Sequence, residues 1–467
     1  MKKKLTVVIR VSIILMVSLF LLSGCAAFQD MLDDLLDIES PSDEKKDDDD
    51  KQVAPSQKPI VLCTYFHYFK SGPEDFDQWW IHGKDPNNIR GPEPWRRDIW
   101  VGREGDYPYI GIYNNVNDGE IMRWHIRLAK AAGISAFLIY VNNWQNERPQ
   151  TDLLLAIAEQ EDFKIGFIEH HSFLGARAIR TLEGRSQPLL PQKYVGYEEI
   201  IKEQSRRIGT SIPSTLSKYN RPMPRGLRNV PADAIQRAKD RISGMLNQWK
   251  SYPAYLRIDG KPIIVIPYMV AGLEAHEFEQ LVDMITGQVG EELYVVAIVP
   301  PVYWYYAPEA VLGTGITQEW ADTGASSFTH WTPNGMITAS QSLRKKVTRY
   351  NVKDSLKWKK DAMIPVMPGF DDDVWRPGDV PAPTAPRRNG DAWKEQLEAA
   401  FSAKPRFLFI QGWNEWHEGA QIEPSTHYSD PYLYLKILSQ KLNKPWQTPS
   451  LPPRDRVDSI RQGYLPY

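Results

Sequence analysis

Residues 118–141 read DGEIMRWHIRLAKAAGISAFLIYV, and they predict one helix followed directly by one strand. Asp118 is a good residue to begin a helix, and Gly133 is a typical residue to end one. Between these two, side chains recur at helical spacing at Ile121, His125, Leu128, Ala129 and Ala132. The run that follows, Ile134–Val141, is rich in apolar β-branched and aromatic residues, as expected of a strand.

The same alternation of strand and helix continues along the chain from Pro59 onward. The predicted strands are Ile60–Phe66, Ile134–Val141, Lys164–His170, Pro262–Pro267, Leu293–Val299, Ala325–His330, Ala362–Met367 and Arg406–Gln411. The predicted helices lie near residues 118–132, 151–161, 232–250, 274–287, 307–321, 338–359, 391–402 and 430–443.

Eight strands, each followed by a helix, predict an α/β fold, a single closed (β/α)8 TIM barrel. A doubly wound open sheet is the alternative. Such a sheet usually has fewer strands and a glycine-rich phosphate-binding turn after the first one. Here the first strand leads into residues 64–69, Thr-Tyr-Phe-His-Tyr-Phe, which contain no such turn. The closed barrel is therefore the favoured fold.

Two connections, 67–117 after the first strand and 171–231 after the third, are much longer than barrel closure needs. Both follow strands, on the side where barrel enzymes build their active sites. The first predicts the wall of a substrate site, because it carries Trp79, Trp80, Trp95, Trp100, Tyr107, Tyr109 and Tyr113. The second predicts a solvated face, with an anion site as the alternative, and carries Arg177, Arg180, Arg185, Arg206, Arg207, Arg221, Arg225 and Arg228.

The first 25 residues have the pattern of an export signal. Three lysines at positions 2–4 precede an apolar stretch, Val11–Leu22, and then Leu22-Ser23-Gly24-Cys25. This pattern resembles a bacterial lipoprotein signal, which implies that Cys25 becomes the first mature residue and carries lipid on its sulfur. A plain transmembrane anchor is the alternative, but Arg10 interrupts the apolar run and leaves it too short to span a bilayer.

Residues 26–58 predict a disordered acidic tether between this signal and a catalytic domain of residues 59–467. The tether contains the charged block Glu44–Lys51 and too little apolar surface after Ile38 to offset its chain entropy. We therefore expect an exported domain in the cell envelope, held at a bacterial membrane by its N-terminal lipid. Cys63 would be the one cysteine left in the mature domain, so neither an internal disulfide nor a cysteine metal site is expected.

The composition argues against a polyanionic partner. The chain has 56 Lys and Arg against 58 Asp and Glu, a net charge of -2, and so offers no overall positive field for nucleic acid. The 16 Trp and 22 Tyr residues could stack on sugar faces, although most buried aromatic residues simply fill cores.

The strand predicted at Arg406–Gln411 runs into Gly412-Trp413-Asn414-Glu415-Trp416-His417-Glu418-Gly419. Polar residues at the carboxyl end of a barrel strand are typical of catalysis. Hydrolysis of a glycosidic bond needs one carboxyl group to protonate the leaving oxygen and a second on the anomeric side, which Glu415 and Glu418 would supply. Trp413 and Trp416 could form a sugar platform beside them. The simpler alternative is that Glu415 and Glu418 belong to a solvated helical turn.

This motif, with Gln421-Ile422-Glu423-Pro424 behind it, resembles the signature of glycoside hydrolase family 99, the endo-α-mannosidases and endo-α-mannanases. Further segments are similar to family segments: Ile110–Tyr113, Arg123–Ile126, Lys130–Ile134 and Tyr255–Pro262. The resemblance extends from about residue 59 to about residue 440. It departs from the family pattern at Tyr140-Val141-Asn142-Asn143-Trp144, where the family usually has an Asp-Trp-Tyr-like segment.

The resemblance implies a retaining mechanism through a 1,2-anhydro sugar, without a metal or other cofactor. It implies that Glu415 is the general base for the sugar 2-hydroxyl and that Glu418 is the general acid and base at the leaving oxygen. A glycan with α-mannoside linkages is the expected partner. The candidate substrate-binding residues are Trp413, Asn414, Trp416, His417, Tyr68, Trp144, Asp371 and Tyr428.

Two other functions remain open on the sequence. One is a sugar-binding lipoprotein without catalysis, which would have no need of two neighbouring carboxylates. The other is a role in polysaccharide assembly, which would call for nucleotide-sugar contacts such as an Asp-x-Asp metal site. Asp371–Asp373 is the one candidate for that metal site, and a pocket-shaping role for Asp371 is the preferred interpretation.

We expect Cys25→Ser to block lipidation and signal processing, because the thiol is the site of acylation. Metabolic labelling with a fatty acid, followed by gel analysis of the purified protein, measures this directly. Label that persists on the serine variant would contradict the lipoprotein interpretation.

Overall fold

The computed structural model describes residues 58–69, 80–81, 99–100, 108–111, 113–141, 144–169, 232–267, 275–298, 316, 318–330, 337, 339–371 and 384–453. The predictions for the signal, Cys25, the tether and the basic connection 171–231 lie outside these residues. Within them, no helix is both long and apolar enough to cross a membrane.

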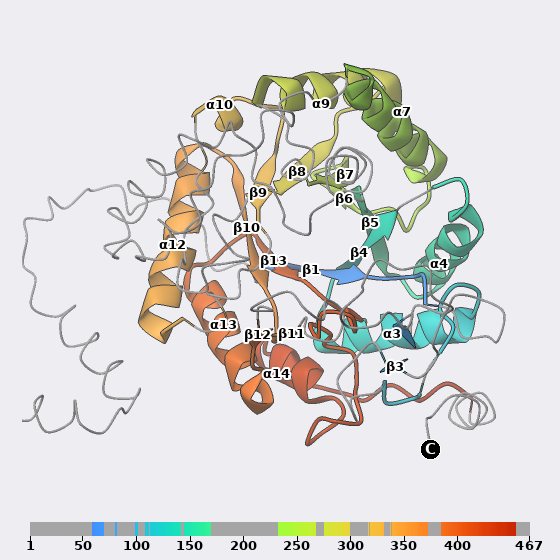
Figure 1. The fold of residues 1–467 in the computed structure, drawn as a ribbon, viewed down its shortest axis with the longest axis vertical. Helices are drawn as coiled ribbons and strands as arrows, with labels where there is room; N and C mark the ends of the chain where they lie inside the picture. Colours follow the sequence, from blue (N-terminus) through green and yellow to red (C-terminus); the bar gives the residue numbers. More distant parts are fainter. Residues whose placement is uncertain are drawn as a thin grey trace, which may run out of the picture.

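The described strands form a closed parallel barrel, as predicted. Its eight strands are β1 Ile60–Tyr65, β4 Ala136–Val141, β5 Lys164–Glu169, β7 Lys261–Ile266, β8 Tyr294–Ile298, β9 Ser327–Thr329, β10 Asp361–Val366 and β13 Phe407–Ile410. Each overlaps its predicted range. Consecutive barrel strands are hydrogen-bonded neighbours, and β13 pairs with β1 to bring the two ends of the chain together. The parallel pairing of β5 with β7, Phe167 opposite Ile264, completes the ring seen in Figure 1.

Helices surround this barrel in the order of the sequence (Figure 1). They are α3 Gly119–Ala132, α4 Arg148–Gln160, α7 Ala232–Trp249, α9 Ala275–Val289, α10 Gln318–Ala321, α12 Gln341–Lys357, α13 Asp391–Ser402 and α14 Leu433–Lys441. Of the helix predicted at 307–321, the described residues contain α10. The remaining short elements are β2 Trp80–Ile81, β3 Ile99–Trp100, β6 Arg257–Ile258, β11 Phe370–Asp371, β12 Thr384–Ala385 and the 3-10 turn η6 Arg388–Gly390.

The ends of α3 follow the chemistry that the sequence predicts. Asp118 Oδ1 accepts a hydrogen bond of 3.1 Å from the Glu120 N–H, which satisfies one of the free donors of the first turn. Gly133 ends the helix in the left-handed conformation, with its N–H directed to Ala129 and Lys130 carbonyls. The chain can therefore turn at once from α3 into β4.

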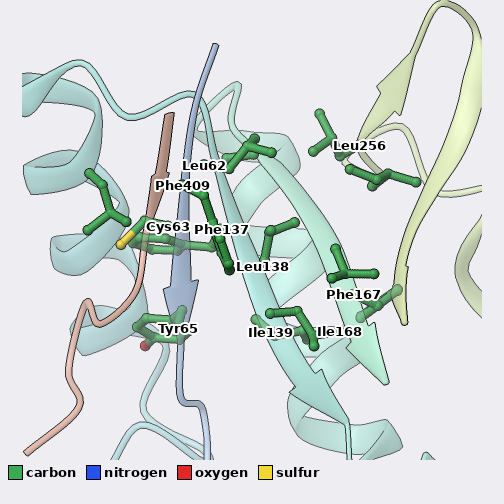
Figure 2. Packing of buried hydrophobic residues seen from close by; sticks show 14 of the residues in the cluster. Leu62, Cys63, Tyr65, Phe137, Leu138, Ile139, Phe167, Ile168, Leu256 and Phe409 are labelled. Carbon is green, nitrogen blue, oxygen red and sulfur yellow. The ribbon is translucent and has the colours of Figure 1, made fainter. Parts of the chain in front are cut away.

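Large apolar side chains from neighbouring strands fill the space between strands and helices. Figure 2 shows Leu62, Phe137, Leu138 and Phe167 among them, and all four are fully buried. Gly166 lies where a larger residue has no room, because a Cβ there would come within 2.7 Å of Leu138 Cδ2 and 2.8 Å of Ile263 Cγ2. This close packing ties β4, β5 and β7 together at the point where the barrel closes.

A polar cluster holds the amino ends of four strands, β7, β8, β10 and β13, together, at the opposite end of the barrel from the predicted site. Arg406, just before β13, donates to Asp259 Oδ1 at 2.6 Å and to Asp361 Oδ2 at 2.6 Å. Tyr294 at the start of β8 donates its hydroxyl to the same Asp361 oxygen at 2.5 Å. The hydrogen bond with Asp259, followed by the charge of Asp361, raises the pKa of Arg406.

We expect Arg406→Met to lower the free energy of unfolding by about 1–2 kcal/mol, between the values for exposed and buried ion pairs, because the Arg406 side chain is 34% exposed. Urea denaturation at low and high salt measures the loss, which should shrink as salt rises. Lys261→Met, which removes an exposed pair with Glu292, is the control and should leave stability unchanged. An equal loss in both variants would contradict a special role for the Arg406 cluster.

Candidate active site

The turn that carries the predicted carboxylates begins where β13 ends, at the carboxyl edge of the barrel. Gly412 has a φ of 135°, and a Cβ at this position would lie 2.4 Å from the Ala420 carbonyl oxygen. The turn then folds back on itself, because the Ala420 N–H donates to the Glu415 carbonyl at 3.0 Å and the Ile422 N–H to the Gly412 carbonyl at 3.0 Å. The local backbone thus requires a glycine to place Glu415 and Glu418 on this edge.

Glu415 and Glu418 interact electrostatically with two tyrosine hydroxyls, those of Tyr68 after β1 and Tyr140 in β4. Burial is the main cause that raises the pKa of both tyrosines well above the ordinary value. The charge of Glu415 and then that of Glu418 raise these two pKa values further. These electrostatic interactions link the four side chains into one group at the carboxyl ends of β1, β4 and β13.

Aromatic side chains pack around this group. Phe66 stacks on Tyr140 with ring centres 5.0 Å apart, and Tyr68 packs against Phe66 at 5.2 Å. His417 stacks on Phe69 at 5.6 Å, and its Nδ1 lies 3.6 Å from Glu415 Oε1. The structure thus brings two predicted binding residues, Tyr68 and His417, beside the predicted base.

The two tryptophans of the motif do not fit the expected sugar platform. The indoles of Trp413 and Trp416 are both 0% exposed, so neither presents a ring face to a ligand. Trp413 packs against Phe137 and His125 in the core, with ring centres 5.2 Å and 5.8 Å away. Trp416 donates its indole N–H to Glu423 Oε2 at 2.9 Å. Both side chains therefore pack into the core and hold the turn there.

Asn414 also has a structural task instead of the predicted contact with substrate. Its Oδ1 accepts from the Phe66 N–H at 2.8 Å, and its Nδ2 donates to the Phe66 carbonyl at 2.8 Å and to the Tyr113 hydroxyl at 3.3 Å. The side chain is fully buried. Asn414 therefore ties the turn that carries Glu415 and Glu418 to the end of β1, two residues before Tyr68.

Tyr428 and Trp144, two further predicted binding residues, have clear packing partners. The Tyr428 hydroxyl donates to the Gln421 carbonyl at 3.2 Å, and the guanidinium of Arg387 lies over its ring at 5.4 Å. Arg387 itself donates to the Gln421 carbonyl at 2.7 Å, so this pair braces the turn. Trp144 packs on α7, with its ring centre 6.4 Å from that of Trp249.

Asp371 lies next to the proposed acid. Its N–H donates to the Glu418 carbonyl at 2.8 Å, and the short pairing of β11 with β12 holds this segment in place. Asp372 and Asp373 lie outside the described residues. Within the part of the chain that the structure describes, no group of three or more His, Cys, Asp and Glu side chains is arranged to hold a metal.

Sequence reasoning missed Tyr140 and a buried carboxylate, Glu169, at the last position of β5. Glu169 is 1% exposed, and its Oε1 lies 3.7 Å from Nη1 of Arg241 on α7. Burial raises the pKa of Glu169 to about 7, although the charge of Arg241 opposes the shift. The signal that could have found both residues is their place at the carboxyl ends of predicted strands.

His67 is a second buried titratable group, at the end of β1. Its Nε2 lies 3.2 Å from Thr151 Oγ1, and burial lowers its pKa to about 4. Its imidazole is therefore neutral at physiological pH.

Part of the chain is similar to one family of known proteins. The family model of Glycosyl hydrolase family 99 matches residues 229–443. The matched region contains Glu415 and Glu418 as well as five of the barrel strands, β7, β8, β9, β10 and β13.

Curated relatives match shorter stretches. A mouse (Mus musculus) glycoprotein endo-alpha-1,2-mannosidase-like protein is 34% identical over 113 residues, 24% of each chain. The mouse glycoprotein endo-alpha-1,2-mannosidase is 33% identical over 141 residues, 27% of this chain and 29% of that protein. The chain thus matches about a quarter of the length of these relatives.

A solved structure supports the fold over a longer range. The GH99 endo-alpha-mannosidase from Bacteroides thetaiotaomicron is similar with a TM-score of 0.56 and 18% sequence identity, covering 86% of this chain and 98% of that one. At this identity the likeness establishes the barrel fold.

The titration of Glu169 predicts a pH dependence of stability. Its pKa lies near 7 in the folded protein against an ordinary value of 4.5, so its stabilising contribution is complete below pH 4.5 and is lost as the pH rises to 7. We expect Glu169→Gln to remove this slope, which amounts to at most about 3 kcal/mol.

Chemical denaturation of both proteins between pH 4.5 and 8 measures the difference. His67 has the opposite slope, because its contribution is lost as the pH falls from 6.5 towards 4. Its effect cancels when the variant is compared with the wild type. The quantity to compare is the slope of stability against pH. The absolute stability also changes, because glutamine leaves Arg241 without the Glu169 carboxylate. Parallel curves for the two proteins would contradict the prediction.

Proposed function

We propose that this protein is a retaining, endo-acting α-glycoside hydrolase that cleaves glycans containing α-mannoside linkages. The observation that carries the proposal is the pair Glu415 and Glu418 at the carboxyl edge of a (β/α)8 barrel, grouped with Tyr68 and Tyr140. The family model match, which spans both carboxylates, supports glycoside hydrolysis, and the names of the endo-alpha-1,2-mannosidase relatives support the substrate class.

Glu415 and Glu418 take different roles in this proposal. In the first step Glu415 removes the proton of the sugar 2-hydroxyl, and the 2-oxygen attacks the anomeric carbon. The bond to the leaving oxygen breaks as Glu418 gives that oxygen its proton. The product of this step is a 1,2-anhydro sugar.

In the second step Glu418 takes a proton from water, and the water oxygen attacks the anomeric carbon. The three-membered ring opens, and Glu415 returns its proton to the 2-oxygen. Both carboxylates regain their starting states, and two inversions give net retention. His417, 3.6 Å from Glu415, and the Tyr68 hydroxyl supply polar contacts around the reacting sugar.

We also propose that the catalytic domain works at the cell envelope, held by lipid on Cys25. The support is the sequence of the first 25 residues together with the charged stretch between Cys25 and the barrel. Such a tether would let the open edge of the barrel reach glycans outside the membrane.

Glu415→Gln and Glu418→Gln should both fold but should differ in their dependence on the leaving group. An activated leaving group needs little protonation. Glu418→Gln should therefore keep part of the rate of the first step with an aryl α-mannoside, while its rate with natural glycans falls by about 100-fold or more. Glu415→Gln should lose activity on both substrates alike, because the 2-hydroxyl still needs its base. Glu398→Gln, on the surface beside Lys345, is the control and should behave as wild type.

Steady-state kinetics and product sizing on defined α-mannans and α-glucans measure these effects. A 2-deoxy or 2-fluoro substrate should not turn over in the wild-type protein, since it lacks the internal nucleophile. Ready cleavage of that analogue would rule out the anhydro sugar and leave the two-carboxylate site in place. Saturable binding of oligosaccharides without any product would instead establish a sugar-binding protein.

A further inference from the structure

A network of buried polar side chains runs beneath the candidate active site and lies outside the proposed chemistry. It joins the end of β1, the segment before α3, α3 itself and the residues that follow the catalytic turn. Its members are all 0% exposed, namely Tyr65, Tyr113, Asn115, His125, Asn414, Trp416 and Glu423. A buried polar network of this size costs desolvation free energy unless every member is hydrogen-bonded.

Glu423 is the acceptor at the centre of this network. Its Oε2 accepts from the Tyr113 hydroxyl at 2.8 Å and from the Trp416 indole N–H at 2.9 Å. Its Oε1 lies 2.9 Å from His125 Nε2. The carboxylate thus meets three donors from three different parts of the chain.

The hydrogen-bond pattern fixes the direction of every donor. Asn115 Oδ1 accepts from the Phe69 N–H at 2.9 Å, so its Nδ2 must donate to the Tyr65 hydroxyl at 3.1 Å and to the Phe66 carbonyl at 2.7 Å. The Tyr65 hydroxyl then gives its own hydrogen to His125 Nδ1, 3.1 Å away. His125 is left with its hydrogen on Nε2, where it donates to Glu423. Donors therefore point one way, from Asn115 through Tyr65 and His125 to Glu423.

The two ends of this chain of donors hold the two sides of the candidate site. At the Glu423 end, Trp416 lies between Glu415 and Glu418 in the sequence, so its hydrogen bond fixes the turn that carries both. At the Asn115 end, the bonds to Phe66 and Phe69 fix the segment that carries Tyr68.

We propose that Glu423, His125, Tyr65 and Asn115 are positioning residues that hold Glu415 and Glu418 in register with Tyr68. The proposal rests on the proposed hydrolase function. None of the four is exposed to a ligand, so each acts through the segments that it holds. A displacement of about 1 Å at a reacting group can cost about 100-fold in rate, which makes such a framework matter for turnover.

Two glutamine substitutions test the order of donors. Glu423→Gln keeps the size of the side chain, but its amide nitrogen must face either His125 Nε2–H or the donors Tyr113 and Trp416. If His125 adapts by moving its hydrogen to Nδ1, the Tyr65 hydroxyl is left without an acceptor in the network, because Asn115 cannot turn. His125→Gln preserves the order, since its amide can donate to Glu423 and accept from Tyr65.

We expect Glu423→Gln and His125→Phe to lower kcat by about 100-fold with KM nearly unchanged, measured well below the unfolding temperature of each variant. His125→Gln should recover most of the lost kcat. Tyr65→Phe, a milder change, should lower kcat by about tenfold. Tyr255→Phe is its matched control, because Tyr255 is also buried and donates to the Ile263 carbonyl at 2.6 Å, outside this network.

Amide hydrogen exchange supplies a readout that does not depend on turnover. The Phe66 and Phe69 amides donate to Asn414 and Asn115, so their exchange should accelerate in Glu423→Gln and Tyr65→Phe, and remain as in wild type in His125→Gln and Tyr255→Phe. Unchanged kcat and unchanged exchange at these two amides in Tyr65→Phe would overturn the proposal. If the wild-type protein cleaves no α-mannoside, the hydrolase function fails, and the exchange data alone decide whether the network holds the two segments together.

Discussion

Closure of a parallel sheet is the constraint on which the rest of the molecule depends. Because β5 pairs with β7 and β13 pairs with β1, all strands of the ring point the same way and end at one edge. Residues far apart in the sequence, such as Tyr68, Tyr140, Glu169 and Glu418, therefore follow or end their strands at that edge. The opposite edge carries Arg406 and its two aspartates, which join strand ends and take no part in the site.

A barrel holds the strand ends in place but leaves the loops beyond them free to choose a conformation. Here polar side chains make that choice, because a buried amide or carboxylate has a strong preference for one set of partners. Asn414 satisfies both backbone groups of Phe66, and Glu423 gathers donors from Tyr113, His125 and Trp416. These specific hydrogen bonds thus fix the conformation of the turn that carries the carboxylates, relative to the strands of the barrel.

The sequence predicted the barrel strands and the caps of α3, because β-branched runs, helical spacing and glycine conformations are local properties. It could not predict which aromatic residues of the motif face outward. Trp413 and Trp416 flank the same carboxylates in the sequence, yet both are buried, since their direction depends on contacts with Phe137 and Glu423. Tyr140 and Glu169 were missed because their neighbours, Glu415 and Arg241, are distant in the chain.

These contacts divide the motif Trp413–Gly419 into residues that hold the turn and residues that could act on a substrate. Three of its side chains, those of Trp413, Asn414 and Trp416, are fully buried and bind the turn to the barrel. Two others, Glu415 and Glu418, are partly buried and interact electrostatically with Tyr68 and Tyr140. These three buried residues would hold the turn in the same conformation with or without the two carboxylates. The presence of the carboxylates on that turn is hence an independent feature, and it is the one that favours hydrolysis over sugar binding alone.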